Sequence, residues 1–194
     1  MLTTTTLREL DFDDALTLVD EGAAFIDLRP ADKYLDVHVP GSLELLYEFG
    51  PGMASRARDC LPLDLELILL DLGDADLINA AASLRGKGFT VAGSVADGIN
   101  AWAERRGPPA STDVVRGASP SEGLLLDVCD PGAGAVPDAV RIPIEKLWWR
   151  VDEVASEPTV VVAAGAGVRA ALAVGILERA GVDAVVFWRL PDTV

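Results

Sequence analysis

One order of elements occurs twice along this chain, and that repeat constrains the fold more than any other feature. Each copy contains an apolar segment that ends in Asp, a proline-containing turn, and a second apolar segment that leads into a loop and a helix. Apolar segments that alternate with amphipathic helices are typical of parallel sheets covered by helices on both faces. The two copies comprise residues 25–30, 38–41 and 67–71, and residues 124–130, 136–139 and 160–164.

Helix and strand signals between these segments support the same interpretation. Asp11 is suited to cap a helix with one apolar face that ends near Gly22. Further strands are predicted over residues 89–95 and 184–188, and the second copy lacks the helix that precedes the first strand of the first copy. The residues expected on the inner face of the helix after the second strand are Ile78, Ala81, Ala82 and Leu84.

The clearest boundary signal is the segment 107–112, which contains two adjacent prolines and no apolar periodicity. The spacing from Asp71 to Gly88 equals the spacing from Ala164 to Gly181, which indicates a duplication. The predicted organisation is a first domain over residues 1–110, a linker over residues 111–121, and a second, shorter domain over residues 122–194.

The amino-acid composition excludes several classes of partner and cofactor. The chain has 31 acidic and 16 basic residues, a formal net charge of −15, so nucleic acid and anionic membranes are not expected partners. Neither a basic leader nor an apolar run of membrane-spanning length occurs, so we expect a cytoplasmic protein. A single histidine excludes a His-rich zinc centre, and we expect no metal and no cofactor. Cys60 and Cys129 lie at non-equivalent places in the two copies, which argues against a disulfide framework.

Three motifs stand in order along the first copy: 26–29 (Ile-Asp-Leu-Arg), 38–41 (His-Val-Pro-Gly), and 97–102 (Asp-Gly-Ile-Asn-Ala-Trp) followed by Gly-Pro. With them the chain resembles a tandem rhodanese-like protein, and it is similar to the rhodanese repeats fused to metallo-β-lactamase-type hydrolases. The resemblance implies an α/β fold with two rhodanese-like domains, each a small, mostly parallel sheet with helices on both faces. The residues assigned to the structural motif are Asp27, Arg29, His38, Pro40, Gly41 and Asp127.

The resemblance also implies where sulfur chemistry would occur. In this family the loop after the second central strand begins with a cysteine that carries a persulfide, but the matching positions here hold Asp71 and Ala164. A carboxylate or a methyl group cannot form the covalent sulfur intermediate. We therefore expect a catalytically degenerate protein, without a catalytic residue in either loop.

The second loop keeps the glycine and the arginine of the family's Cys-X-X-Gly-X-Arg pattern. It is a candidate anion site, because backbone N–H groups at a helix start bind anions without help from side chains. The alternative is a strand-to-helix turn that keeps its glycines for geometry alone. The first loop is not expected to bind anions, because it carries Asp71, Asp74 and Asp76. The candidate anion-binding residues are Ala164, Gly165, Ala166, Gly167, Val168 and Arg169.

Other chemistry-bearing residues have plainer interpretations. Cys129 stands where the first copy has Arg29; it is either a relocated sulfur carrier or, as we favour, a small apolar filler. Cys60 follows an aspartate and is expected to be a poor nucleophile. His38 is expected to brace its loop by hydrogen bonding. The cluster 147–149 (Leu-Trp-Trp) either anchors an interface or caps the smaller second core, and the sequence does not decide.

The leading hypothesis is a non-catalytic binding or regulatory module that recognises a small oxyanion or a sulfur-carrier protein. The rival is a sulfurtransferase that uses Cys129 or a cysteine of a partner protein. A third hypothesis is a regulatory part of a hydrolase fusion. The sequence leaves a homo-oligomer open.

Overall fold

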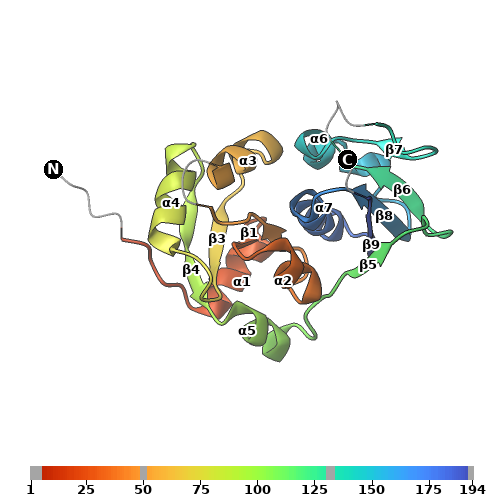
Figure 1. The fold of residues 1–194 in the computed structure, drawn as a ribbon. Coiled ribbons are helices and arrows are strands. Elements are labelled where there is room, and N and C mark those ends of the chain that lie inside the picture. Colours follow the sequence, from red (N-terminus) through yellow and green to blue (C-terminus); the bar gives the residue numbers. More distant parts are fainter. Residues whose placement is uncertain (1–5, 49–51, 130–133, 192–194) are drawn as a thin grey trace.

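The computed structural model describes residues 6–48, 52–129 and 134–191. It contains two parallel sheets with helices packed between and around them (Figure 1). Both sheets follow one strand order when the second is taken from its opposite edge, β2-β1-β3-β4 and β7-β6-β8-β9, with β5 added beside β9. Every pair of neighbouring strands is parallel. None of the described helices is long and apolar enough to cross a membrane.

The first sheet is covered by helices on both faces. Alternate side chains of its strands point to two separate clusters, as expected for strands of period two. One cluster joins the sheet to α1 and α5, and the other joins it to α2, α3 and α4. Its elements are α1 (Phe12–Asp20), β1 (Ala24–Asp27), α2 (Ala31–Asp36), β2 (Leu43–Glu44), α3 (Gly52–Cys60), β3 (Leu67–Asp71), α4 (Leu77–Gly86), β4 (Val91–Ala96) and α5 (Gly98–Arg105).

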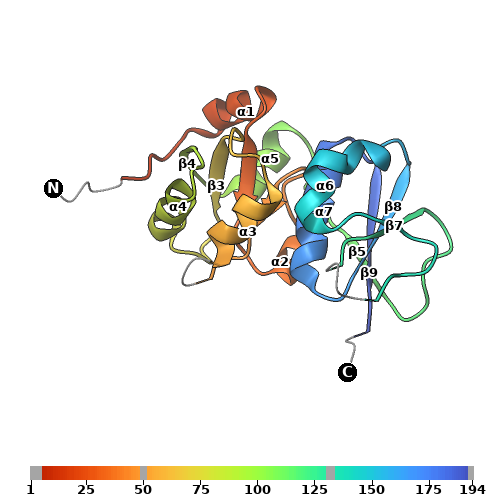
Figure 2. The same ribbon diagram turned by 90° about the horizontal axis from the view of Figure 1, so that it is seen from above.

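The second sheet carries its helices on one face. α6 and α7 both lie on the side that faces the first sheet, and among the described residues no helix lies across the other side (Figure 2). This differs from the expectation of helices on both faces, because only residues 117–123 separate β5 from β6, where the first sheet has α1. The elements are β5 (Asp113–Arg116), β6 (Leu124–Asp127), β7 (Val140–Arg141), α6 (Ile144–Arg150), the 3-10 helix η1 (Val151–Glu153), β8 (Thr159–Ala164), α7 (Gly167–Arg179) and β9 (Ala184–Arg189).

α7 belongs to the cores of both halves. It packs on β8 and β9 of its own sheet and on α2 and β2 of the first half. At Gly175 the backbones approach so closely that an added Cβ atom would overlap the Ser42 carbonyl oxygen. Because only glycine leaves room for this contact, the position fixes how deeply α7 seats against β2.

Two local predictions differ in outcome. Asp11 caps α1 as predicted, since its side chain accepts the Asp13 backbone N–H at 2.9 Å. The inner face of α4 is wrong in part: Ala81 and Leu84 are buried, but Ile78 is 59% exposed and Ala82 is also exposed. The helix begins at Leu77, after its Asp76 cap, and the face toward the core is the one that carries Ala80 rather than Ile78.

The segment 111–121, expected to be a linker, contributes a strand. β5 pairs with β9 over four residues and forms the edge of the second sheet. The first sheet has a matching edge contact, a parallel bridge between Glu9 and Ser94 beside β4. Three of the four β5 residues are exposed, so its sequence shows little of the apolar pattern that marks the central strands.

Candidate functional site

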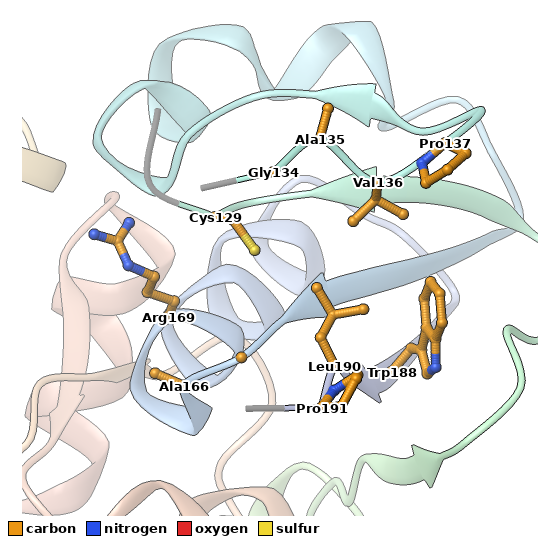
Figure 3. A pocket seen from close by; sticks show the side chains of 11 residues that line it. Cys129, Gly134, Ala135, Val136, Pro137, Ala166, Arg169, Trp188, Leu190 and Pro191 are labelled. Carbon is orange, nitrogen blue, oxygen red and sulfur yellow. The ribbon is translucent and has the colours of Figure 1, made fainter. Parts of the chain in front are cut away.

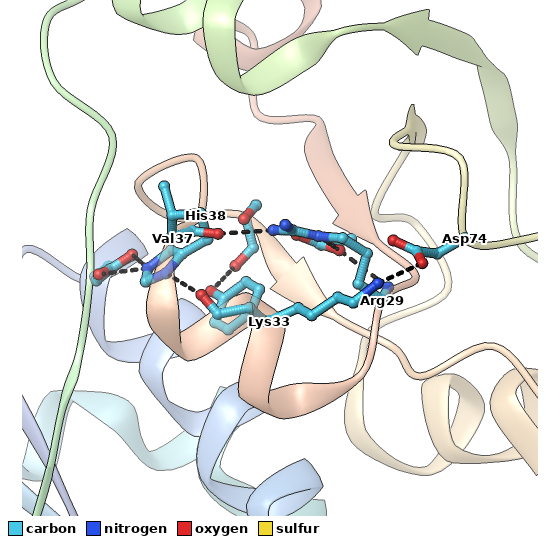
Figure 4. Close-up of polar contacts among 9 residues, drawn as sticks. Arg29, Lys33, Val37, His38 and Asp74 are labelled. Carbon is cyan, nitrogen blue, oxygen red and sulfur yellow. Dashed lines mark hydrogen bonds and ion pairs between the residues drawn. The ribbon is translucent and has the colours of Figure 1, made fainter.

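A buried ion pair closes the end of β1. The Arg29 guanidinium lies 2.6 Å from Asp27 Oδ2 and donates to the Val37 carbonyl oxygen at 2.7 Å (Figure 4). The Arg29 backbone N–H also donates to Asp27 Oδ1 at 3.0 Å. These bonds fasten the strand end to the turn that follows α2, where sequence reasoning placed the structural motif.

His38, in the same motif, bridges the two halves of the molecule. Its ring is fully buried; Nδ1 lies 2.8 Å from the Tyr34 carbonyl oxygen and Nε2 lies 3.0 Å from Glu178 Oε1 on α7. The Gly41 backbone N–H donates to Glu178 Oε2 at 2.7 Å, so the turn around Pro40 is held from both sides. Both ring nitrogens face acceptors, so the contact requires a proton on each nitrogen or a proton on the carboxylate.

The acidic loop after β3 is occupied by its own contacts. Asp74 forms an ion pair with Lys33 at 2.6 Å (Figure 4). Asp76 caps α4 by accepting the Asn79 backbone N–H at 3.1 Å, and Asp71 accepts the Gly73 backbone N–H at 3.3 Å. The three carboxylates therefore stabilise the loop itself.

A pocket of about 420 Å³ opens at the carboxyl edge of the second sheet (Figure 3). Cys129 follows β6, Gly165 and Ala166 follow β8, and Trp188 comes from the end of β9. The carboxyl edge of a parallel sheet is the usual position of a ligand site in α/β folds. The remaining lining residues are Gly134, Ala135, Val136, Pro137, Arg169, Leu190 and Pro191.

The candidate anion-binding loop has a short and tightly packed form. Ala164 is fully buried at the end of β8, and α7 already begins at Gly167, after Ala166, which makes no side-chain cap. The Arg169 guanidinium lies 3.0 Å from Glu145 Oε1 on α6. In Figure 3 its head points away from Trp188 and Leu190. The positive charge expected to serve an anion is thus shared with a carboxylate that sequence reasoning missed.

Asp127 repeats part of the role of Asp27. It accepts the Cys129 backbone N–H at 2.9 Å and the Val136 backbone N–H at 3.3 Å. Its charge partner is Arg141 on the neighbouring strand β7, at 3.5 Å. The cation therefore comes from the neighbouring strand β7, whereas in the first half it comes from Arg29, two residues beyond the end of β1.

Both cysteines are buried thiols held in the neutral form. Burial raises the pKa of the Cys60 thiol to about 12, with smaller contributions from Glu145 and Asp59. Burial also raises the pKa of Cys129, and Asp127 adds to the shift. The thiolate is the reactive form of cysteine, so neither residue is activated. Cys129 nevertheless lines the pocket, with Sγ 3.8 Å from the Ala163 carbonyl oxygen.

A third buried carboxyl group, besides Asp27 and Asp127, was not predicted from the sequence. Glu44 pairs in register with Asp27 on the adjacent strand, and both of its carboxyl oxygens are buried without a hydrogen-bond partner. Burial raises its pKa well above the ordinary value, and Asp27 adds to the shift while Arg56 opposes it. No local pattern marks Glu44, because its neighbours are set by strand pairing. Within the described residues, no cluster of side chains could hold a metal ion.

Comparison with known proteins assigns the first half to a family. Residues 11–105 match the family model of the rhodanese-like domain. The first half of this chain is a rhodanese-like domain. The match covers β1 with its Asp27–Arg29 pair, the turn at His38 and the acidic loop after β3. No curated protein sequence matches the chain.

Two solved structures resemble the whole chain weakly. A thiosulfate sulfurtransferase from Pseudomonas aeruginosa is 20% identical, with a TM-score of 0.43, over 97% of this chain and 43% of its own. A 3-mercaptopyruvate sulfotransferase from Escherichia coli is 18% identical, with a TM-score of 0.41, over 97% of this chain and 100% of its own. This chain thus spans less than half the length of the first of these proteins.

Proposed function

We propose that this chain is a non-catalytic, tandem rhodanese-like module that binds or regulates rather than transfers sulfur. The observation that carries the proposal is the residue at the head of each central loop. Asp71 ends β3 and Ala164 ends β8, where the family places its persulfide cysteine. A repeated second domain is supported by the common order of the strands in the two sheets.

The assay that tests this proposal is turnover of thiosulfate and cyanide to thiocyanate. The wild-type protein is expected to give no rate above a buffer blank, because neither loop supplies a nucleophile. The Cys129→Ser variant is the matched control, since Cys129 lines the pocket. Turnover by the wild type that disappears in Cys129→Ser would establish the rival sulfurtransferase and refute the proposal.

The ligand class we propose for the second loop is a small oxyanion, presented free or on a sulfur-carrier protein. Gly165 and Ala166 line the pocket, and the first turn of α7 directs backbone N–H groups toward its N-terminus. The Glu145 carboxylate opposes binding, since it lies 3.0 Å from the Arg169 guanidinium. Binding is therefore expected to be weak, and Glu145 is expected to limit it.

Calorimetric titrations with sulfate and thiosulfate measure how the Glu145 and Arg169 charges each affect anion binding. Glu145→Gln is expected to tighten binding about threefold to tenfold, because it removes a like charge near the anion. Arg169→Ala is expected to weaken binding by a similar factor. Negligible binding by all three proteins would mean that the loop is only a strand-to-helix turn, while the absence of turnover would remain a separate result.

A further inference from the structure

The two adjacent tryptophans of α6 have different environments. Trp148 is partly buried against the core, and the Arg179 guanidinium lies 5.8 Å from the centroid of its ring. Trp149 is 56% exposed, and among the described residues it is the one aromatic side chain in the set of exposed large hydrophobic residues. Trp148 therefore closes the contact between the halves, whereas most of the Trp149 side chain remains accessible to solvent.

Trp149 borders a groove of about 630 Å³ where α6 meets the first half. Gly22 and Ala23 precede β1, and Leu65 and Glu66 precede β3, so the groove lies at the amino edge of the first sheet. The loops of the proposed oxyanion site lie at the carboxyl edges of the sheets. The groove is consequently separate from that site.

Three carboxylates line the groove: Glu21, Asp64 and Glu66. None of them forms an ion pair with any residue in the described parts of the chain, and Glu21 and Asp64 are exposed. Like charges that share a concave surface repel one another and create a negative potential, which attracts a cation. The net charge of −15 extends this attraction over the whole molecule.

The chain itself already places one guanidinium at this junction. Arg179 donates to the carbonyl oxygens of Gly22 at 3.0 Å and Ala23 at 3.2 Å, two residues that also line the groove. Its guanidinium simultaneously lies over the Trp148 ring. Indole rings attract cations through their negative faces, and Trp is the strongest such partner. The second ring, Trp149, offers the same chemistry beside unpaired carboxylates.

We propose that this groove docks a basic peptide segment of a partner protein, with an arginine or lysine side chain against Trp149 and the carboxylates. Charge complementarity selects this occupant, since nucleic acid and anionic lipid would meet the same three negative charges. The long aliphatic stem of such a side chain would cover the indole while its charged head reaches the groove wall. This surface would give the module a protein partner independently of any ligand at the second loop.

The test uses the full chain and an acetylated, amidated peptide that carries four arginines, with the same peptide carrying glutamines as a control. Calorimetry at low ionic strength is expected to show binding of the arginine peptide only. Trp149→Ala is expected to weaken it about tenfold, and Trp149→Phe by less, because a smaller ring remains. Asp64→Asn and Glu66→Gln are each expected to weaken it about threefold. Glu122→Gln, an exposed acid on the β5–β6 connection, is the matched control and is expected to leave affinity unchanged.

Three results would overturn the proposal. The first is no binding of the arginine peptide at low salt. The second is equal weakening by Glu122→Gln and Glu66→Gln, which would mean diffuse attraction to an acidic protein. The third is a dimer in sedimentation that Trp149→Ala dissociates, because a second copy of the chain would then be the occupant. Urea unfolding of each variant tests whether the fold is kept. The Trp149 variants are expected to unfold like the wild type, because the Trp149 side chain contributes little to the core.

Discussion

The two sheets neutralise the charge of a buried aspartate with different cationic residues. Each has a fully buried aspartate at the end of its first central strand, and each aspartate accepts the backbone N–H two residues further on. In the first sheet the balancing cation is Arg29, on the same chain segment. In the second it is Arg141, which stands on the neighbouring strand in register with Asp127.

This exchange changes what the adjacent positions can do. Where the first sheet has Glu44, the second has Arg141, since each pairs in register with the aspartate of its sheet. Arg29 is bound to Asp27, and both Glu44 carboxyl oxygens are buried without a hydrogen-bond partner. With Arg141 serving Asp127, position 129 no longer needs a cation and holds a cysteine beside the pocket. Both sheets thus have the buried aspartate, but its cationic partner comes from a different position in each.

The largest expected difference follows removal of the two aspartate charges. Asp27→Asn leaves Arg29 buried without a charge partner, and the free energy of unfolding is expected to fall by about 3 kcal/mol. Asp127→Asn is expected to cost about 1 kcal/mol, because Arg141 is 30% exposed and can be solvated. Urea unfolding of both variants measures the two losses. Equal losses would show that Arg141 is as dependent on its partner as Arg29.

The contact that joins the halves is the next test. Glu178→Ala leaves the His38 ring and the Gly41 backbone N–H without their acceptor, and the free energy of unfolding is expected to fall by about 2 kcal/mol. Glu157→Ala, an exposed acid in the second half, serves as the control and is expected to change little. A Glu178→Ala protein as stable as the wild type would mean that the halves hold together by apolar packing alone.

The smallest effect is expected at Glu44, and its sign depends on pH. Burial raises the pKa of Glu44 above its ordinary value of 4.5, so the folded chain retains a proton that the unfolded chain releases. Stability is therefore lost as pH rises above the unfolded value. Glu44→Gln is expected to raise the free energy of unfolding by about 1 kcal/mol at pH 7 and to leave it nearly unchanged at pH 4. A destabilised Glu44→Gln protein at pH 7 would indicate that Arg56 holds the carboxylate in its charged form.

Much of this architecture could be predicted from local sequence. The central strands are short apolar runs, and the aspartate cap of α1 has a local signature in Asp11. The placement of Asp71 and Ala164 at the positions of the family's cysteine also rests only on the order of motifs along the chain, and it stays a prediction. These features depend on residues that are close in sequence.

The missed features depend on residues far apart in sequence. Glu178 reaches His38 across 140 positions, and Glu145 reaches Arg169 from a different helix. No periodicity or spacing in the sequence predicts either contact. The prediction of a linker over residues 111–121 misses β5, because an exposed edge strand needs few apolar residues. The prediction that Ile78 lies inside is wrong because α4 turns Ala80 rather than Ile78 toward the core.

The connection between the halves has a consequence for motion. His38 and Ala110 form an antiparallel bridge, the Thr112 backbone N–H donates to the Leu35 carbonyl oxygen at 2.8 Å, and β5 begins at the next residue. The crossing chain is thus fastened to the first half up to Thr112 and to the second sheet from Asp113 onward. Hinge bending needs a few residues that are free to change their backbone angles. Because the crossing segment has no free residues, the two halves are expected to move as one rigid body. A ligand that binds between them is then expected to bind without a domain-opening motion.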